Sequence, residues 1–280
     1  MSGYLPVAFA AMQPFLVHEL GAGGQLMAMS PRSDVAPAPG TAQLGGDIVW
    51  RHESHYGPFG DRSIGEGRLT LMIDDEGVTR LSRLQVSGLP FTLRIRPQLG
   101  DAFDLTLLGG SVDQVWAGAD TPGGYWRTYT PVTLTALGLS NTDFDPDRKV
   151  KAYVQAGIGL GMEVSVSLLG PVGLYARAEG EARSLNRHQG NAENQVRHET
   201  LGEASAGVVL NLGDTSVRAV AWGELVTQWE TRDADRASGV DRQLQAAGVR
   251  LVVRIRERPH QERPPSPRDG TVDGVADAGE

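Results

Sequence analysis

Residues 150–168 read VKAYVQAGIGLGMEVSVSL, and an apolar side chain stands at every even position from Val150 to Leu168. The odd positions carry glycine, serine or polar residues such as Lys151 and Glu163. Successive strand side chains point to opposite faces, so the segment predicts a β-strand with one apolar and one polar face. A soluble strand averages about 5–6 residues, whereas a membrane-spanning strand needs about 9–11 and can extend further. This length favours a transmembrane barrel strand, and a hairpin turning near residues 157–161 is the alternative.

The same alternation recurs on both sides of this segment. It predicts strands over about 42–53, 65–74, 78–97, 101–116, 123–137, 149–168, 172–184, 196–211, 215–230 and 242–256. The phase shifts near Gly88, which we interpret as a bulge in a single strand, since an inserted residue exchanges the faces. The count is then ten strands in an all-β, antiparallel up-and-down transmembrane barrel. If 78–97 is two strands, a further strand within residues 4–30 makes twelve.

Short and long connections alternate along this pattern. Gly170-Pro171 and residues 212–215 predict tight turns. Longer polar loops are expected at 54–64, 138–148, 185–195 and 231–241. Short turns at one end and long loops at the other are typical of outer-membrane barrels, and an even strand count places both termini at the same end.

Composition excludes several classes of protein. The net charge of −8 argues against nucleic-acid binding, which needs a concentrated basic surface. The absence of cysteine excludes thiolate metal sites and disulfides. No run of 18 apolar residues is present, so a transmembrane helix is excluded. We expect no cofactor and no bound metal.

The chain divides into three parts. Residues 1–41 are expected to be an export or linker segment, in which Ala8 and Ala10 match a cleavage pattern, although an extra strand or hairpin fits equally well. Residues 42–257 form the predicted barrel. Residues 258–280 contain four prolines and little apolar surface, which predicts a disordered tail.

Alternation alone does not say which face meets lipid, because a soluble barrel would turn the apolar face inward. Two features favour the membrane. The polar face carries both signs of charge, and Trp50, Trp116, Trp126 and Trp229 stand near strand ends, as in interfacial girdles. The predicted interior charge network consists of Glu163, Arg177, Glu179, Glu181, Arg183, Glu203, Arg218, Glu224, Arg250 and Arg254.

On this pattern, residues 42–256 resemble the class of Gram-negative outer-membrane β-barrels, without matching an individual family. The resemblance implies an outer-membrane location with lipid around the barrel. The chain departs from the class at its C-terminus, because the last strand ends in Arg254-Ile255-Arg256-Glu257 and a polar tail, where many such barrels end on an aromatic residue.

We therefore predict a non-enzymatic, porin-like scaffold or narrow channel. Its loops would meet a small polar solute or a surface partner. The interior charges would pair structurally or line a narrow polar conduit. One alternative is a soluble β-barrel that binds a ligand in an apolar interior.

The other alternative is an outer-membrane barrel hydrolase. Its weak candidate residues are His52, His55, His188 and His198, beside carboxylates at the rim. Ser165, Ser167 and Ser205 lack a G-x-S-x-G context and fit small interior residues. His18-Glu19 lacks the second histidine of a zinc-protease motif.

Overall fold

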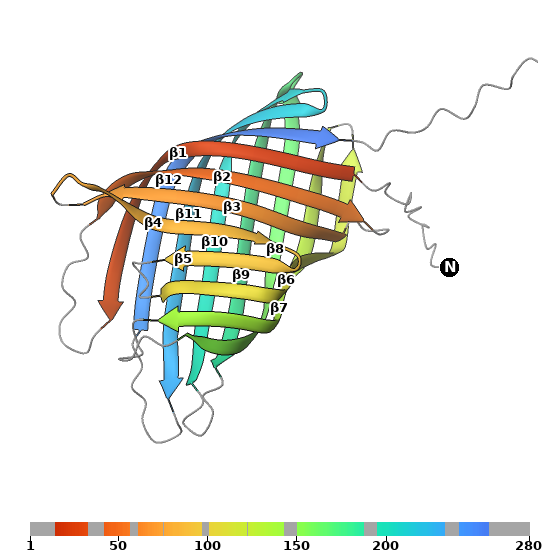
Figure 1. Ribbon diagram of the computed structural model, residues 1–280. Coiled ribbons are helices and arrows are strands. Elements are labelled where there is room, and N and C mark those ends of the chain that lie inside the picture. Colours follow the sequence, from red (N-terminus) through yellow and green to blue (C-terminus); the bar gives the residue numbers. More distant parts are fainter. Residues whose placement is uncertain are drawn as a thin grey trace, which may run out of the picture.

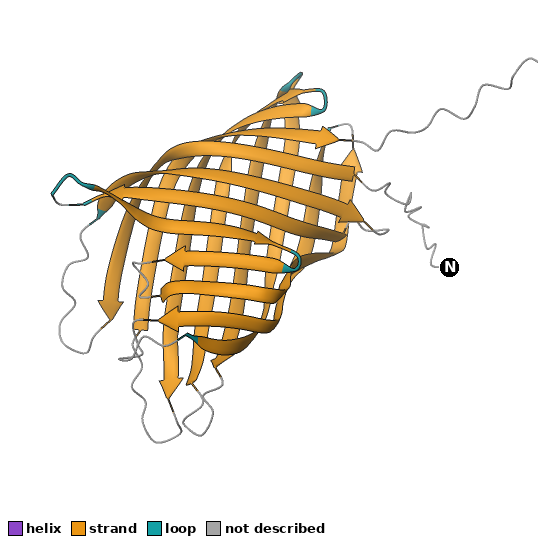
Figure 2. Cartoon of the chain, in the orientation of Figure 1, coloured by secondary structure: helices purple, strands orange, loops and turns teal. Residues whose placement is uncertain are grey.

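The computed structural model describes residues 15–32, 42–56, 61–74, 76–96, 101–121, 123–142, 150–187, 195–232 and 241–257. These residues form twelve strands, which account for nearly all of the described chain (Figure 2). The strands are β1 (Phe15–Arg32), β2 (Gln43–Tyr56), β3 (Asp61–Ile73), β4 (Thr79–Gly88), β5 (Phe91–Arg96), β6 (Asp101–Thr121), β7 (Gly124–Thr142), β8 (Lys151–Leu169), β9 (Val172–Arg187), β10 (Gln195–Leu212), β11 (Thr215–Arg232) and β12 (Asp241–Glu257). Within these ranges, no helix is long and apolar enough to cross a membrane.

The strands close into one antiparallel barrel (Figure 1). Each strand pairs with its neighbour in the sequence, and β12 pairs with β1 from Leu16↔Glu257 to Arg32↔Asp241. Because alternate strands run in opposite directions, the start of β1 and the end of β12 lie at one end of the barrel, called here the terminus end. The predicted all-β, up-and-down barrel is confirmed in its twelve-strand form. The extra strand is β1, which lies within the segment expected to be an export signal or linker.

The connections differ between the two ends. At the terminus end, β2–β3, β4–β5, β6–β7, β8–β9 and β10–β11 are joined by residues 57–60, 89–90, 122–123, 170–171 and 213–214. At the opposite end the connections include the longer ones, 33–42, 143–150, 188–194 and 233–240. Gly170 and Gly213 have φ of 55° and 73°, which suits the tight turns after β8 and β10.

The loop predicted at 54–64 is wrong. Strands β2 and β3 stay paired as far as Tyr56↔Asp61, so only residues 57–60 connect them, and they lie at the terminus end. The residues at the end of β2 and the start of β3 are mostly polar, so the sequence alone predicts a loop where the structure has paired strands. The loop predicted at 138–148 begins within β7, which continues to Thr142. Residues 143–149, 188–194 and 233–240 of the other predicted loops lie outside the described residues.

The bulged strand predicted over 78–97 is also wrong, because this segment is the hairpin β4–β5. The chain reverses at Leu89 and Pro90, and the two strands pair from Gly88↔Phe91 to Leu84↔Ile95. The change of phase therefore marks a turn rather than an inserted residue. Beyond the tip of this hairpin, β3 and β6 pair directly at Arg62↔Asp113. The wall thus has twelve strands over most of its height and ten where β3 meets β6.

The apolar face of the sheet lies outside. On β8, Ile158, Leu160 and Met162 are 64%, 67% and 53% exposed, while Glu163 and Ser165 on the other face are buried. A soluble barrel with an apolar interior would show the reverse, so that alternative is excluded. An apolar outer surface around a closed sheet is the arrangement in which strands cross a bilayer, because every backbone group is paired within the ring. The chain is a membrane β-barrel.

The glycines of β8 explain the rest of its pattern. Strand β8 runs without a break from Lys151 to Leu169, so the hairpin alternative near 157–161 is wrong. Gly161 pairs with Tyr129 of β7, whose ring lies directly against it: a Cβ at Gly161 would be 2.3 Å from the ring. The interior face of β8 is therefore kept small to admit side chains from neighbouring strands.

Candidate functional site

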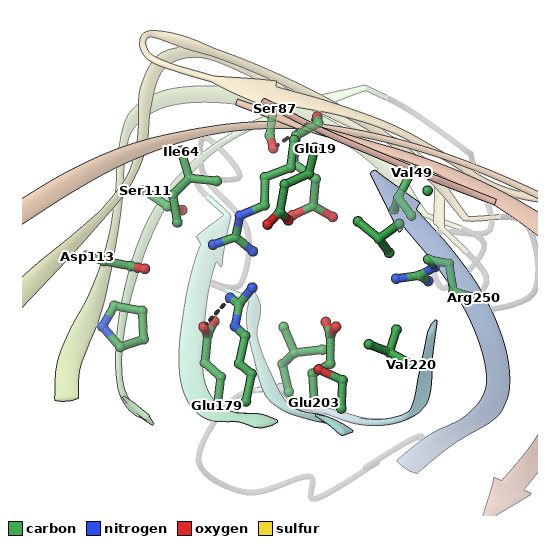
Figure 3. Close-up of a pocket in the computed structure, with 18 of the residues that line it drawn as sticks. Glu19, Val49, Ile64, Ser87, Ser111, Asp113, Glu179, Glu203, Val220 and Arg250 are labelled. Atoms are coloured by element: carbon green, nitrogen blue, oxygen red, sulfur yellow. Dashed lines mark hydrogen bonds and ion pairs between the residues drawn. The ribbon is translucent and has the colours of Figure 1, made fainter. Parts of the chain in front are cut away.

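A central cavity of about 160 Å³ lies inside the barrel, lined by polar side chains from both walls (Figure 3). In this view Glu19 and Ser87 lie across the cavity from Glu179 and Glu203. Val49 and Val220 line part of the same space. Its charged lining consists of Arg51, Arg177, Arg183, Arg218, Arg250, Glu19, Glu66, Asp113, Glu179, Glu181 and Glu203.

Arg62 forms an ion-pair cluster that crosses the interior. Its side chain, on β3, has no exposed surface. Its Nε donates to Asp113 on β6 at 2.8 Å, and its Nη1 donates to Glu163 on β8 at 3.0 Å and to Glu53 on β2 at 3.4 Å. Strands β3 and β8 are not neighbours in the sheet, so the Arg62–Glu163 pair spans the inside of the barrel.

Glu224 is the centre of a second crossing. Arg68 on β3 donates to its Oε2 at 2.9 Å, and Arg83 on β4 donates to its Oε1 at 2.9 Å. All three side chains are buried. Because Glu224 belongs to β11, these bonds again join strands that do not pair with each other.

A third cluster lies nearer the end opposite the termini. Arg96 at the end of β5 donates to Glu199 at 3.0 Å, and Arg197 donates to Asp104 of β6 at 3.0 Å. Both Arg197 and Glu199 stand close to the start of β10. Gln228 of β11 also donates to Glu199, at 2.6 Å. The interior is thus bridged toward both ends of the barrel.

Tyr125 connects the walls at the terminus end. Its hydroxyl donates to Glu163 at 2.6 Å and accepts from Arg218 at 3.0 Å and from Arg254 at 2.8 Å. Glu19 on β1 lies 3.3 Å from each of these two arginines. One phenol of β7 therefore holds two arginines that project from β11 and β12.

The structure places the ten residues of the predicted interior network on the inner side of the wall. Glu163, Arg218, Glu224 and Arg254 take part in the bridges described above. The other members interact near the central cavity or line it. Arg177 donates to Glu179 at 2.7 Å, Arg183 donates to Glu181 at 2.6 Å, Arg250 donates to Asp47, and Glu203 lines the cavity.

Sequence reasoning missed most of the partners from the N-terminal half. Glu19 lay in the segment expected to be an export signal or linker, and Arg62 lay in the predicted loop at 54–64. Arg83 follows a register shift at Ser82, where Thr70 pairs with Arg83 and Leu71 with Leu81, so simple alternation does not mark it as an interior residue. Arg68 could have been found, because it alternates with Leu69 and Leu71 in the same way as the charged residues of β8 to β12.

The candidate histidines do not come together. His55 is buried, stacks on Phe15 at 4.1 Å and contacts Glu53 at 2.9 Å. His52 is on the outer face, with its Nδ1 3.3 Å from that of His18 on β1. His198 stacks on Trp229 at 5.4 Å, and His188 lies outside the described residues. Within the described ranges, no group of three or more His, Asp and Glu side chains could hold a metal ion.

The remaining candidates have structural positions. Ser165 and Ser205 face the interior, as expected for small polar residues. His18 and Glu19 lie on a strand and point to opposite faces, so no zinc-protease helix is formed. Trp50, Trp116 and Trp126 are 45%, 57% and 45% exposed on the outer surface, which suits contact with a membrane interface.

No protein-family model and no curated protein sequence matches the chain. It is similar in structure to a neisserial surface protein A (7% identity, 85% of this chain and 96% of that chain, TM-score 0.30). It is also similar to the outer membrane protease OmpT from Escherichia coli (8% identity, 89% of this chain and 98% of that chain, TM-score 0.31). A third similar structure is the monoaromatic hydrocarbon channel TodX (10% identity, 91% of this chain and 92% of that chain, TM-score 0.29). These scores support no inference about function. The predicted resemblance to outer-membrane barrels is confirmed at the level of fold by the closed, even-stranded ring itself.

Proposed function

We propose that this chain is a non-enzymatic outer-membrane β-barrel with an interior closed by ion pairs, and that it serves as a membrane scaffold. The observation that carries the proposal is the set of bonds across the interior. Arg62 joins β3 to β8, Glu224 joins β11 to β3 and β4, and Arg96 joins β5 to β10. Removing one partner of such a pair is costly, so these bridges favour a filled interior over an open pore.

The outer-membrane location is supported by the form of the barrel. Bacterial single-chain barrels have an even number of strands, short turns at the end that carries the termini and longer loops at the other end. The described strands and the lengths of their connections follow this arrangement. In the proposed orientation the terminus end faces the periplasm, and the connections at 143–150, 188–194 and 233–240 would meet a surface partner.

A narrow channel for a small polar solute is the second candidate. The central cavity supports it, because Glu19, Arg51, Arg177 and Glu203 surround a space large enough for several waters. The bridges at Arg62 and Glu224 would then set a narrow constriction. No observation among the described residues favours the hydrolase alternative over these two.

Conductance in planar lipid bilayers tests the proposal. The purified full-length protein is expected to give little or no current, because the interior ion pairs hold the walls together. The double variant R62A/R254A, which removes the Arg62 bridge from β3 to β8 and the contacts of Arg254 with Glu19 and Tyr125, should conduct measurably more. An electrophoretic shift between unheated and heated samples confirms that both proteins are folded. Large, stable open channels from the unaltered protein would overturn the proposal.

A double variant that gives no more current than the unaltered protein, yet still shows the electrophoretic shift of a folded barrel, would also count against the proposal. In that case the ion pairs would not be what closes the interior.

A further inference from the structure

A second cavity, of about 510 Å³, opens at the terminus end of the barrel. We call it the vestibule. The turns at Gly170-Pro171 and Gly213-Asp214 form part of its rim, and Phe15 and Tyr125 lie in its wall. It is separate from the central cavity of Figure 3, and Arg218 lines both.

The vestibule carries an excess of positive charge. Four arginines line it, namely Arg127, Arg218, Arg254 and Arg256, against the two carboxylates Asp120 and Asp214. Arg256 pairs with Asp120 at 3.2 Å. Arg218 and Arg254 share Glu19 and the Tyr125 hydroxyl. Asp120 and Glu19 are thus occupied by three of the four arginines.

Arg127 is the fourth arginine, and it has no acidic partner of its own. Only 3% of the residue is exposed, and its buried Nη1 has no hydrogen-bond partner among the described residues. Its register partner across β7–β8 is Glu163, whose two oxygens bind Tyr125 and Arg62. The guanidinium contacts aromatic rings instead, with its Cζ 4.9 Å from the centre of Tyr125 and 6.0 Å from that of Phe15.

A buried guanidinium without a counter-ion is unfavourable, since desolvation is not offset by pairing. We propose that the vestibule binds a small oxyanion such as phosphate or sulfate through Arg127, with Arg218, Arg254 and Arg256 contributing charge. Arginine suits such a ligand because its planar fork donates two parallel hydrogen bonds to an oxyanion. The hydroxyls of Ser165 and Ser216 in the same lining can donate further bonds.

Thermal unfolding of the purified full-length protein in detergent tests this site. Inorganic phosphate is added at constant ionic strength, with sodium chloride making up the balance. A ligand that binds only the folded state raises Tm in a saturable way. The R127Q variant should bind phosphate about tenfold or more weakly, and R127K should retain part of the affinity. R80Q is the matched control, because Arg80 lies on β4 with 63% of its side chain exposed, in contact with Asp74 and Glu76.

The comparison between R127Q and R80Q removes the general stabilisation that phosphate and sulfate give to proteins. If Tm depends on phosphate equally in the two variants, the site is overturned. The same holds if phosphate raises the Tm of the unaltered protein no more than sodium chloride does. If R127Q does not fold, R256Q tests the same site, since the Arg256 side chain is 34% exposed. Because R256Q removes one contributing charge and keeps Arg127, it should weaken phosphate binding by a smaller factor, and a phosphate dependence equal to that of R80Q would overturn the site. Because Tm is measured without current, this result is independent of the conductance experiment.

Discussion

Glu224 is a single interior residue that bonds to two buried arginines. It accepts from Arg68 and Arg83, and a second carboxylate, Asp47, lies 3.5 Å from Arg68. Arg83 has no other ion pair within the described residues. Loss of Glu224 would therefore leave Arg83 as a buried, uncompensated charge.

We expect E224A to lower the free energy of unfolding by about 3–5 kcal/mol, the usual cost of breaking a buried ion pair. Urea unfolding in detergent micelles measures it. E76A is the control, because 78% of the Glu76 side chain is exposed and its pairing with Arg80 at 3.6 Å lies in solvent. That variant should change the free energy by less than about 1 kcal/mol. Similar losses in both variants would mean that Glu224 does not anchor the two arginines.

Gly161 provides a test of packing at a single residue. A Cβ there would lie 2.3 Å from the ring of Tyr129, a fully buried residue whose hydroxyl donates to Glu179. G161A should therefore destabilise the barrel by about 1–3 kcal/mol, the range for overpacking. G180A is the control, since the nearest atom to its added Cβ is 3.9 Å away. Urea unfolding of both variants checks this, and equal stability would show that the ring moves freely.

At the scale of the element, positions along β8 test how depth in the membrane affects the free-energy cost of placing a charge on the outer face. Leu160 is at the middle of the strand and 67% exposed on the outer face, whereas Leu169 is its last residue and 81% exposed. L160R should cost about 2–4 kcal/mol and L169R about 0–1 kcal/mol, because an arginine near the interface reaches water. Unfolding in lipid vesicles measures both. Equal costs would mean that Leu160 does not face the centre of a bilayer.

The elements also show what could be predicted from the sequence. Strands β8 to β12 were predicted closely, because each keeps one phase over a long run and ends at a turn such as Gly170-Pro171. The N-terminal half was predicted less well. Strand β1 is rich in glycine and alanine, so its alternation of apolar and polar residues is weak. The hairpin at Leu89-Pro90 was interpreted as a bulge. Ion-pair partners could not be predicted, since Arg62 and Glu163 are brought together only by closure of the ring.

At the scale of the whole molecule, the exposed apolar belt predicts how the protein behaves in cells and in solution. We expect it to sediment with membranes, to require detergent for extraction and to migrate faster on gels before heating than after. The physical reason is that side chains such as Ile158, Leu160 and Val249, all more than 60% exposed, are unfavourable in water. Recovery of folded protein in buffer without detergent would contradict this.

The seam between β1 and β12 has a consequence for biogenesis. It pairs Leu16 with Glu257, so the first and last described strands close the sheet on each other. Until β12 has been synthesised, β1 and the latest strand both present open edges, which a bilayer cannot hydrogen-bond. The ring therefore cannot close, and its edge groups cannot be satisfied within lipid, before β12 is available to pair with β1.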